Sequence, residues 1–118
     1  MNKTMSIDRS KAINAESVSR ILRTVSVPEA FNFFSDIGQY DGKSVTSLAD
    51  FCEKLKTVPL KSMEFHFKRG DFERWIRETL GDEYLACEIG KIDKWVHGEA
   101  LRTALQGTVE NRLHYFKQ

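Results

Sequence analysis

The dipeptide Gly-Asp occurs at residues 70–71 and again at residues 81–82, and it constrains the fold more than any other feature of the sequence. Glycine readily adopts the left-handed conformation that ends a helix. Aspartate accepts hydrogen bonds from the first free N–H groups of a following helix. Each pair therefore predicts a helix end followed at once by a helix start, so that neighbouring helices turn sharply against each other.

Apolar residues recur at three- and four-residue spacing through most of the chain, as in Leu48, Phe51, Cys52 and Leu55. This period is typical of a helix with one buried face. The predicted fold class is therefore all-α, with five or six short helices packed as one compact bundle. The expected helices cover residues 9–25, 47–57, 62–69, 71–80, 82–92 and 99–116.

Residues 26–37 fit two structures. Ser26 and Glu29 have the spacing of a capping box, and Gly38 could end a helix, so local chemistry favours a helix here. The alternation of Phe31 and Phe33 instead indicates a strand, and a hairpin could turn at residues 41–42, Asp-Gly. A short extended or hairpin segment near residues 31–45 therefore stays open as the alternative.

The 118 residues predict a single helical domain, 1–118, in which residues 1–8 form a flexible arm. The formal net charge is +1, although residues 1–27 carry five basic and two acidic side chains, a local net charge of +3. No apolar run is long enough to cross a bilayer, and the first residues lack an apolar signal core. We therefore expect a cytoplasmic protein with reduced cysteines.

Residues 65–76, FHFKRGDFERWI, form the densest group of aromatic and charged side chains in the chain. One interpretation is a catalytic site in which His66 acts as a general base oriented by Asp71 or Glu73. The favoured interpretation is a structural joint, in which His66 bonds a backbone group at the helix joint that follows it and Trp75 belongs to the core. The residues of this joint, or candidate site, are His66, Arg69, Gly70, Asp71 and Trp75.

Nucleic-acid binding is the main alternative function. The basic arm could act with side chains that would face phosphates, and the helices predicted at 47–57 and 61–69 loosely resemble a helix-turn-helix. Acidic residues are interleaved with the basic ones, which argues against a basic face. The candidate nucleic-acid contacts are Arg20, Arg23, Lys61, Lys68 and Arg77. Ligand spacings typical of metal sites and Gly-rich phosphate loops are absent from the sequence, so no metal or cofactor is expected.

The series His66-x-x-Arg69-Gly70-Asp71-Phe72-x-x-Trp75-Ile76 resembles an uncharacterised, mostly archaeal prokaryotic domain family. The resemblance spans roughly residues 30–90 and includes the Phe31-x-Phe33 segment, the Ser47-Leu48-x-x-Phe51 segment and residues 80–86. It implies a cytosolic accessory domain and an extended conformation at Phe31–Phe33. The family has no established activity, so the resemblance implies no catalytic residue.

The predicted function is a non-catalytic protein-interaction or regulatory module, with another protein or a second copy of the chain as partner. A surplus of aromatic residues off the predicted core stripes supports this function if they form one exposed patch: Phe65, Tyr84, Trp95 and Tyr115. The second alternative is the nucleic-acid binder. The third is a small hydrolase or sugar-binding domain centred on His66 and Asp71, which requires a deep pocket containing both side chains.

Overall fold

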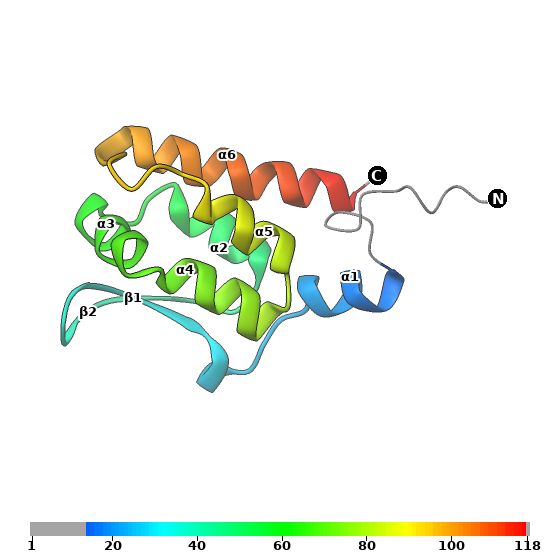
Figure 1. Ribbon diagram of the computed structural model, residues 1–118. Coiled ribbons are helices and arrows are strands. Elements are labelled where there is room, and N and C mark those ends of the chain that lie inside the picture. Colours follow the sequence, from blue (N-terminus) through cyan, green and yellow to red (C-terminus); the bar gives the residue numbers. More distant parts are fainter. Residues whose placement is uncertain (1–13, 118) are drawn as a thin grey trace.

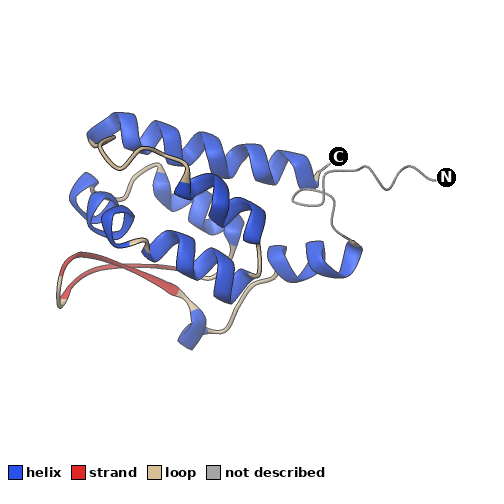
Figure 2. Cartoon of the chain, in the orientation of Figure 1, coloured by secondary structure: helices blue, strands red, loops and turns tan. Residues whose placement is uncertain are grey.

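Helices make up most of the computed structural model, which describes residues 14–117 of the chain (Figures 1 and 2). The predicted arm at 1–8 and the start of the helix predicted at 9–25 lie outside the described residues. The elements in chain order are α1 Ala15–Leu22, a 3₁₀ turn Val27–Glu29, β1 Phe31–Asp36, β2 Gln39–Val45, α2 Leu48–Leu55, α3 Leu60–Arg69, α4 Asp71–Arg74, a π-helical segment Trp75–Leu80, α5 Glu83–Gly90 and α6 Gly98–Phe116.

A β-hairpin corrects the all-α prediction. Strands β1 and β2 pair antiparallel as a two-stranded sheet, so the hairpin alternative for residues 31–45 is confirmed and the preference for a helix at 26–37 is wrong. The reason is burial: the alternation of a strand places Phe31 and Phe33 in the core, 7% and 0% exposed. A helix that buried Phe31 together with Ile37 would have turned Phe33 away, and Ile37 is in fact 71% exposed.

The capping box predicted at residues 26 and 29 does not form, because the Ser26 side chain caps no backbone N–H. Its hydroxyl instead donates to the Glu29 carboxylate at 3.1 Å, and the pair spans only the single 3₁₀ turn before β1. The hairpin turns at residues 37–38, where Gly38 has φ +73°, and not at Asp41-Gly42 as expected. Gly42, with φ +80°, instead lies inside β2 at one of the two irregularities in strand register. Its left-handed conformation fits a β-bulge at this position.

The two Gly-Asp joints form as sharp turns, but their aspartates differ. Gly70 and Gly81 both adopt the left-handed conformation, with φ +74° and +86°, as predicted. Asp82 caps α5 by accepting a hydrogen bond from the Leu85 N–H at 3.1 Å. Asp71 does not cap α4, because its side chain makes no hydrogen bond to the helix backbone. The repeated dipeptide therefore has two different uses.

Between the joints, the predicted helix 71–80 divides into α4 and the π-helical segment. The N–H groups of Gly81 and Asp82 both donate to the Ile76 carbonyl, at 2.9 and 3.0 Å. This wider turn keeps Trp75, Ile76 and Leu80 in the core, where they are at most 8% exposed.

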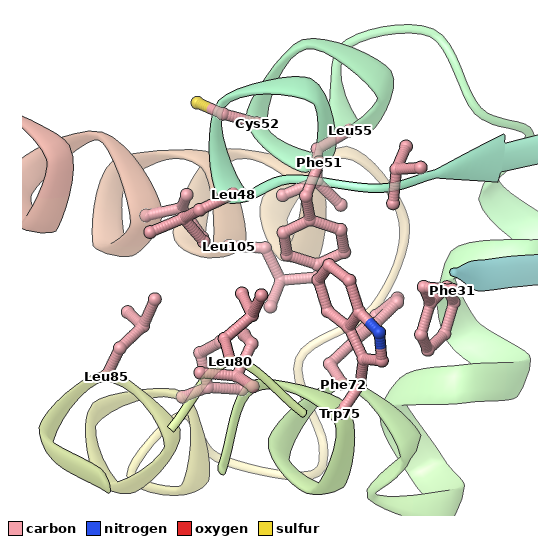
Figure 3. Close-up of a cluster of buried hydrophobic side chains, with 14 of the residues drawn as sticks. Phe31, Leu48, Phe51, Cys52, Leu55, Phe72, Trp75, Leu80, Leu85 and Leu105 are labelled. Carbon is pink, nitrogen blue, oxygen red and sulfur yellow. The ribbon is translucent and has the colours of Figure 1, made fainter. Parts of the chain in front are cut away.

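The core lies between α6 on one side of the molecule and the hairpin on the other, with α2 to α5 between them (Figure 1). Side chains from β1, α2, α4, the π-helical segment, α5 and α6 meet in it (Figure 3). Leu48, Phe51 and Leu55 of α2 are fully buried, as their spacing predicts. Cys52 is also buried, and Cys87 is exposed; both are free thiols.

The remaining boundaries are close to the predicted ones, with two exceptions. The first is α1, which ends at Leu22 and not at residue 25, because Arg23 is extended and the Val25 N–H donates to the Thr46 carbonyl at 2.7 Å. The second is the start of α3. Ser47 caps α2 by accepting from the Asp50 N–H at 3.1 Å, and α6 covers the predicted range at the end of the chain. Ser62 does not start α3, which begins two residues earlier at Leu60; its side chain is fully buried. None of the helices between residues 14 and 117 is long and apolar enough to span a membrane.

Candidate functional site

A cleft of about 470 Å³ lies between the hairpin and the helical joint at Gly70. We call it the joint cleft. The hairpin contributes Phe31, Asn32, Phe34, Asp36 and Ile37. The helices contribute Phe65, His66 and Arg69 from α3, Asp71 and Arg74 from α4, and Trp75 and Glu78 from the π-helical segment. The cleft therefore brings together four of the five candidate residues of the joint, all except Gly70.

His66 has both ring nitrogens occupied. Its Nε2 accepts a hydrogen bond from the Phe34 N–H at 2.8 Å, and its Nδ1 lies 2.8 Å from Asp71 Oδ2. The backbone partner is therefore on the hairpin and not at the following helix joint as predicted, where His66 meets a side chain instead. Because Nε2 accepts, the proton of the neutral ring is on Nδ1, which donates to the carboxylate. The ring is 4% exposed and packs edge-on against Phe31, with ring centroids 4.7 Å apart.

The electrostatic state of His66 follows from this environment. Burial lowers the pKa of His66 below its ordinary value, although the hydrogen bond with Asp71 opposes the shift. Protonation of Nε2 would also place two donors, the ring N–H and the Phe34 N–H, against each other. The imidazole therefore stays neutral near pH 7.

Asp71 is the centre of the polar network at the joint. Its Oδ2 accepts from His66 and from Arg69 Nε at 3.0 Å, and its Oδ1 accepts from Arg74 Nη1 at 2.8 Å. Burial raises the pKa of Asp71, but the hydrogen bonds from His66, Arg74 and Arg69 together outweigh burial and hold that pKa below its ordinary value. The carboxylate is thus ionised and neutralised by its neighbours.

Trp75 and Ser62 hold the hairpin against the helices. Trp75 Nε1 donates to the Glu29 carbonyl at 2.8 Å, so the indole is a core residue with its polar atom satisfied, as predicted. The Ser62 hydroxyl donates to the Phe34 carbonyl at 2.9 Å. Ser62 and His66, one helical turn apart on α3, therefore satisfy both backbone groups of Phe34. Sequence reasoning missed Ser62, Phe34 and Arg74, and the four-residue spacing of Ser62 and His66 was the available signal.

The residues predicted to contact nucleic acid are spread over separate parts of the chain. Two of these residues already use their side chains in hydrogen bonds within the protein. Arg23, directly after α1, donates to the Thr79 carbonyl at 2.9 Å, and Arg77 pairs with Glu83 at 3.0 Å. The guanidinium of Arg20, on α1, lies against Gly81. Lys61 and Lys68 on α3 are exposed. Most of these cations therefore pack against neighbouring segments instead of forming one free basic surface.

A second hollow, of about 270 Å³, lies between α5 and α6. Arg112 lines it and forms a two-point ion pair with Asp82, at 2.8 and 2.9 Å, in which both side chains are at most 2% exposed. The guanidinium also packs over the rings of Phe116 and Tyr84, at 4.4 and 4.7 Å. This network fixes α6 to the start of α5.

The four aromatic residues expected to form one patch lie in three places. Phe65 belongs to the joint cleft, and Tyr84 and Tyr115 line the second hollow. Trp95, which is 87% exposed, lies on the loop before α6. The exposed-patch expectation therefore does not hold in the form predicted.

Comparison with known proteins adds no family to this description. The chain matches no protein-family model, no curated protein and no solved structure. The resemblance to the archaeal domain family therefore stays a prediction. Among residues 14–117 there is also no group of three or more His, Cys, Asp or Glu side chains placed to hold a metal ion.

Proposed function

We propose that the protein is a non-catalytic recognition module that binds another protein through the joint cleft and the adjoining hairpin end. The observation that carries this proposal is the state of His66. The cleft contains the one buried imidazole of the described chain, and both of its nitrogens are already bonded to the protein. A general base needs a free nitrogen within reach of the proton that it removes.

The composition of the cleft also favours recognition. Its walls combine aromatic rings with two half-exposed guanidiniums, those of Arg69 and Arg74. Aromatic residues and arginine are the side chains that contribute most to the centres of protein interfaces. At one end of the cleft the hairpin presents Ile37, 71% exposed, and Tyr40, 52% exposed, which extend the apolar surface.

A hydrolase is the second candidate, because His66 and Asp71 line one cleft and are 2.8 Å apart, as a base and its orienting carboxylate would be. Two observations weigh against it. The Phe34 N–H occupies the nitrogen that would act as base. Of the described residues that line the cleft, Thr79 supplies a hydroxyl, and serine, cysteine and lysine are absent.

We propose a cytoplasmic location for this module, since both cysteines are free thiols, as a reducing compartment requires. Whether the partner is a different protein or a second copy of the chain is decided by the experiment below.

Site-specific photo-crosslinking in the source cell tests the proposed function. A photoreactive benzoylphenylalanine would replace Ile37 at the cleft, or Thr103 on the exposed face of α6 as a matched control. We expect covalent adducts from position 37 and few from position 103. An adduct of twice the chain mass would identify a homodimer, and an adduct of any other mass a different partner. Equal or absent labelling at both positions, with the chain folded, contradicts the proposal.

A further inference from the structure

The two arginines of the joint cleft are held in position before any ligand arrives. Arg69 Nε and Arg74 Nη1 donate to different oxygens of Asp71, whose side chain is 13% exposed. The Arg69 guanidinium also lies over the Phe65 ring, 4.9 Å from its centroid. Side chains ordered in advance lose less conformational entropy on binding, so this arrangement favours a ligand of matching shape.

Both guanidiniums have N–H groups that could still donate hydrogen bonds to a ligand. Arginine has five N–H groups. Within the described residues, Nη1 and Nη2 of Arg69 and Nε of Arg74 have no hydrogen-bond partner, and the two side chains are 50% and 56% exposed. Paired N–H groups in one plane match the two oxygens of a carboxylate or phosphate group. The cleft is therefore equipped to bind an oxyanion.

The charge balance separates the two kinds of oxyanion. Two guanidiniums, one carboxylate and a neutral imidazole give the cluster at Asp71 a net charge of +1. One carboxylate neutralises that charge, whereas a phosphate group with about two negative charges exceeds it. Asp36 and Glu78 also line the cleft and make its lining as a whole net negative, so only the cluster at Asp71 attracts an anion, and a second negative charge on the ligand would be repelled. The balance favours a carboxylate.

From these observations we infer that the occupant of the joint cleft is a peptide segment of the partner protein that carries one acidic side chain and, next to it, an apolar side chain. The carboxylate binds Arg69 and Arg74, and the apolar group packs against Phe34 and Ile37 at the hairpin end of the cleft. The inference rests on the proposed function and adds the chemistry of the partner to it.

A library of random dodecapeptides displayed on phage, selected against the 118-residue chain, tests this inference. We expect selected peptides to share one Asp or Glu beside an apolar residue. In fluorescence anisotropy, a synthetic selected peptide should lose about tenfold or more in affinity when its acid is replaced by the amide, because the charge-assisted hydrogen bonds are lost. Replacing the acid by phosphoserine should also weaken binding.

Two double variants give the matched comparison. Arg69→Ala with Arg74→Ala should weaken binding about as much as the amide peptide does. Lys61→Ala with Lys68→Ala removes the same charge from exposed positions outside the cleft and should leave binding unchanged. If the arginine variant does not fold, the comparison of acid and amide peptides on the unmodified chain decides the question.

The outcomes distinguish a failure of the carboxylate inference from a failure of the proposed protein-recognition function. Selected peptides without an acid, or acidic peptides that bind the arginine variant as well as the native chain, contradict the carboxylate inference and leave protein recognition standing. Tighter binding of the phosphoserine peptide contradicts the choice of carboxylate over phosphate. A library that yields no binding peptide, together with no crosslinks at position 37, contradicts the proposed function itself.

Discussion

Replacement of His66 by leucine should lower the free energy of unfolding by about 2.5–4 kcal/mol. Leucine fills much of the space of the ring but makes neither hydrogen bond. The bond to the Asp71 carboxylate is worth about 1.5–3 kcal/mol, and the part-buried Phe34 N–H left without a partner adds about 1 kcal/mol. Urea denaturation at pH 7.5, followed by circular dichroism, measures the change. His114→Leu, at an exposed position on α6, is the control and should change the value by less than about 0.5 kcal/mol.

The same residue predicts a dependence of stability on pH. Because the pKa of His66 is lower in the folded chain than its ordinary value of 6.5, the unfolded chain takes up the proton first as the pH falls. The contribution of neutral His66 to the free energy of unfolding is therefore fully present above the pKa of the unfolded chain. This contribution decreases as the pH falls below about 6.5 and towards the pKa of the folded chain. Denaturation curves at pH 7.5 and 5.5 should show this loss in the native chain and a smaller loss in His66→Leu.

Two results would refute this account of His66. A His66→Leu variant as stable as the native chain at pH 7.5 would show that the two hydrogen bonds do not hold the joint together. A native chain and a His66→Leu variant that lose equal stability between pH 7.5 and 5.5 would show that another group is responsible. The first of these results would leave the imidazole free for a role in catalysis.

Three further substitutions test the rest of the structure by the same denaturation assay. Arg112→Leu leaves the buried Asp82 carboxylate without its partner and should cost about 3–5 kcal/mol; a cost under 1 kcal/mol would contradict the buried ion pair. Gly81→Ala, at φ +86°, should lower the free energy of unfolding by about 1–2 kcal/mol or more. Gly107→Ala, in open space on α6, is the control and should raise it by at most about 1 kcal/mol. Equal effects of the two substitutions would contradict the left-handed joint. Trp75→Phe removes one hydrogen bond and should cost about 1 kcal/mol from that loss, well below the roughly 3–5 kcal/mol of Trp75→Ala.

The features that could be predicted from the sequence depend on residues close together in the chain. The left-handed glycines at positions 70 and 81, the caps at Ser47 and Asp82 and the inner face of α2 follow from backbone preferences within one or two helical turns. These local rules act in the same way wherever the segment lies in the fold. They therefore gave the sharp turns and the buried faces correctly.

The features that were missed depend on contacts across the chain. The hairpin forms because Phe33 finds its place in a core built by distant helices, and the Phe34 backbone finds partners 28 and 32 residues away in Ser62 and His66. The residue types at positions 26–37 reveal neither the burial of Phe33 nor the hydrogen-bond partners of the Phe34 backbone. Asp71 has the sequence of a helix cap, but two arginines and the imidazole reach it in the folded chain.

The same limit applies to the candidate site. The dense segment at residues 65–76 identified the helical wall of the joint cleft, including His66, Arg69 and Asp71. It could not reveal the opposite wall, because the hairpin residues stand about thirty positions earlier in the chain. It also could not show that the ring nitrogens of His66 are occupied, since one of their partners is a backbone group of that hairpin.

The π-helical segment Trp75–Leu80 makes this part of the chain sensitive to length. A π turn holds one residue more than an α-helical turn, and one residue corresponds to a rotation of about 100° around a helix axis. Deletion of a single residue here would restore regular helical spacing but rotate everything that follows, including Asp82, away from Arg112. Exposed positions such as Arg77 can therefore vary in side chain, whereas an insertion or deletion between residues 75 and 80 would uncouple α5 and α6 from the first half of the chain.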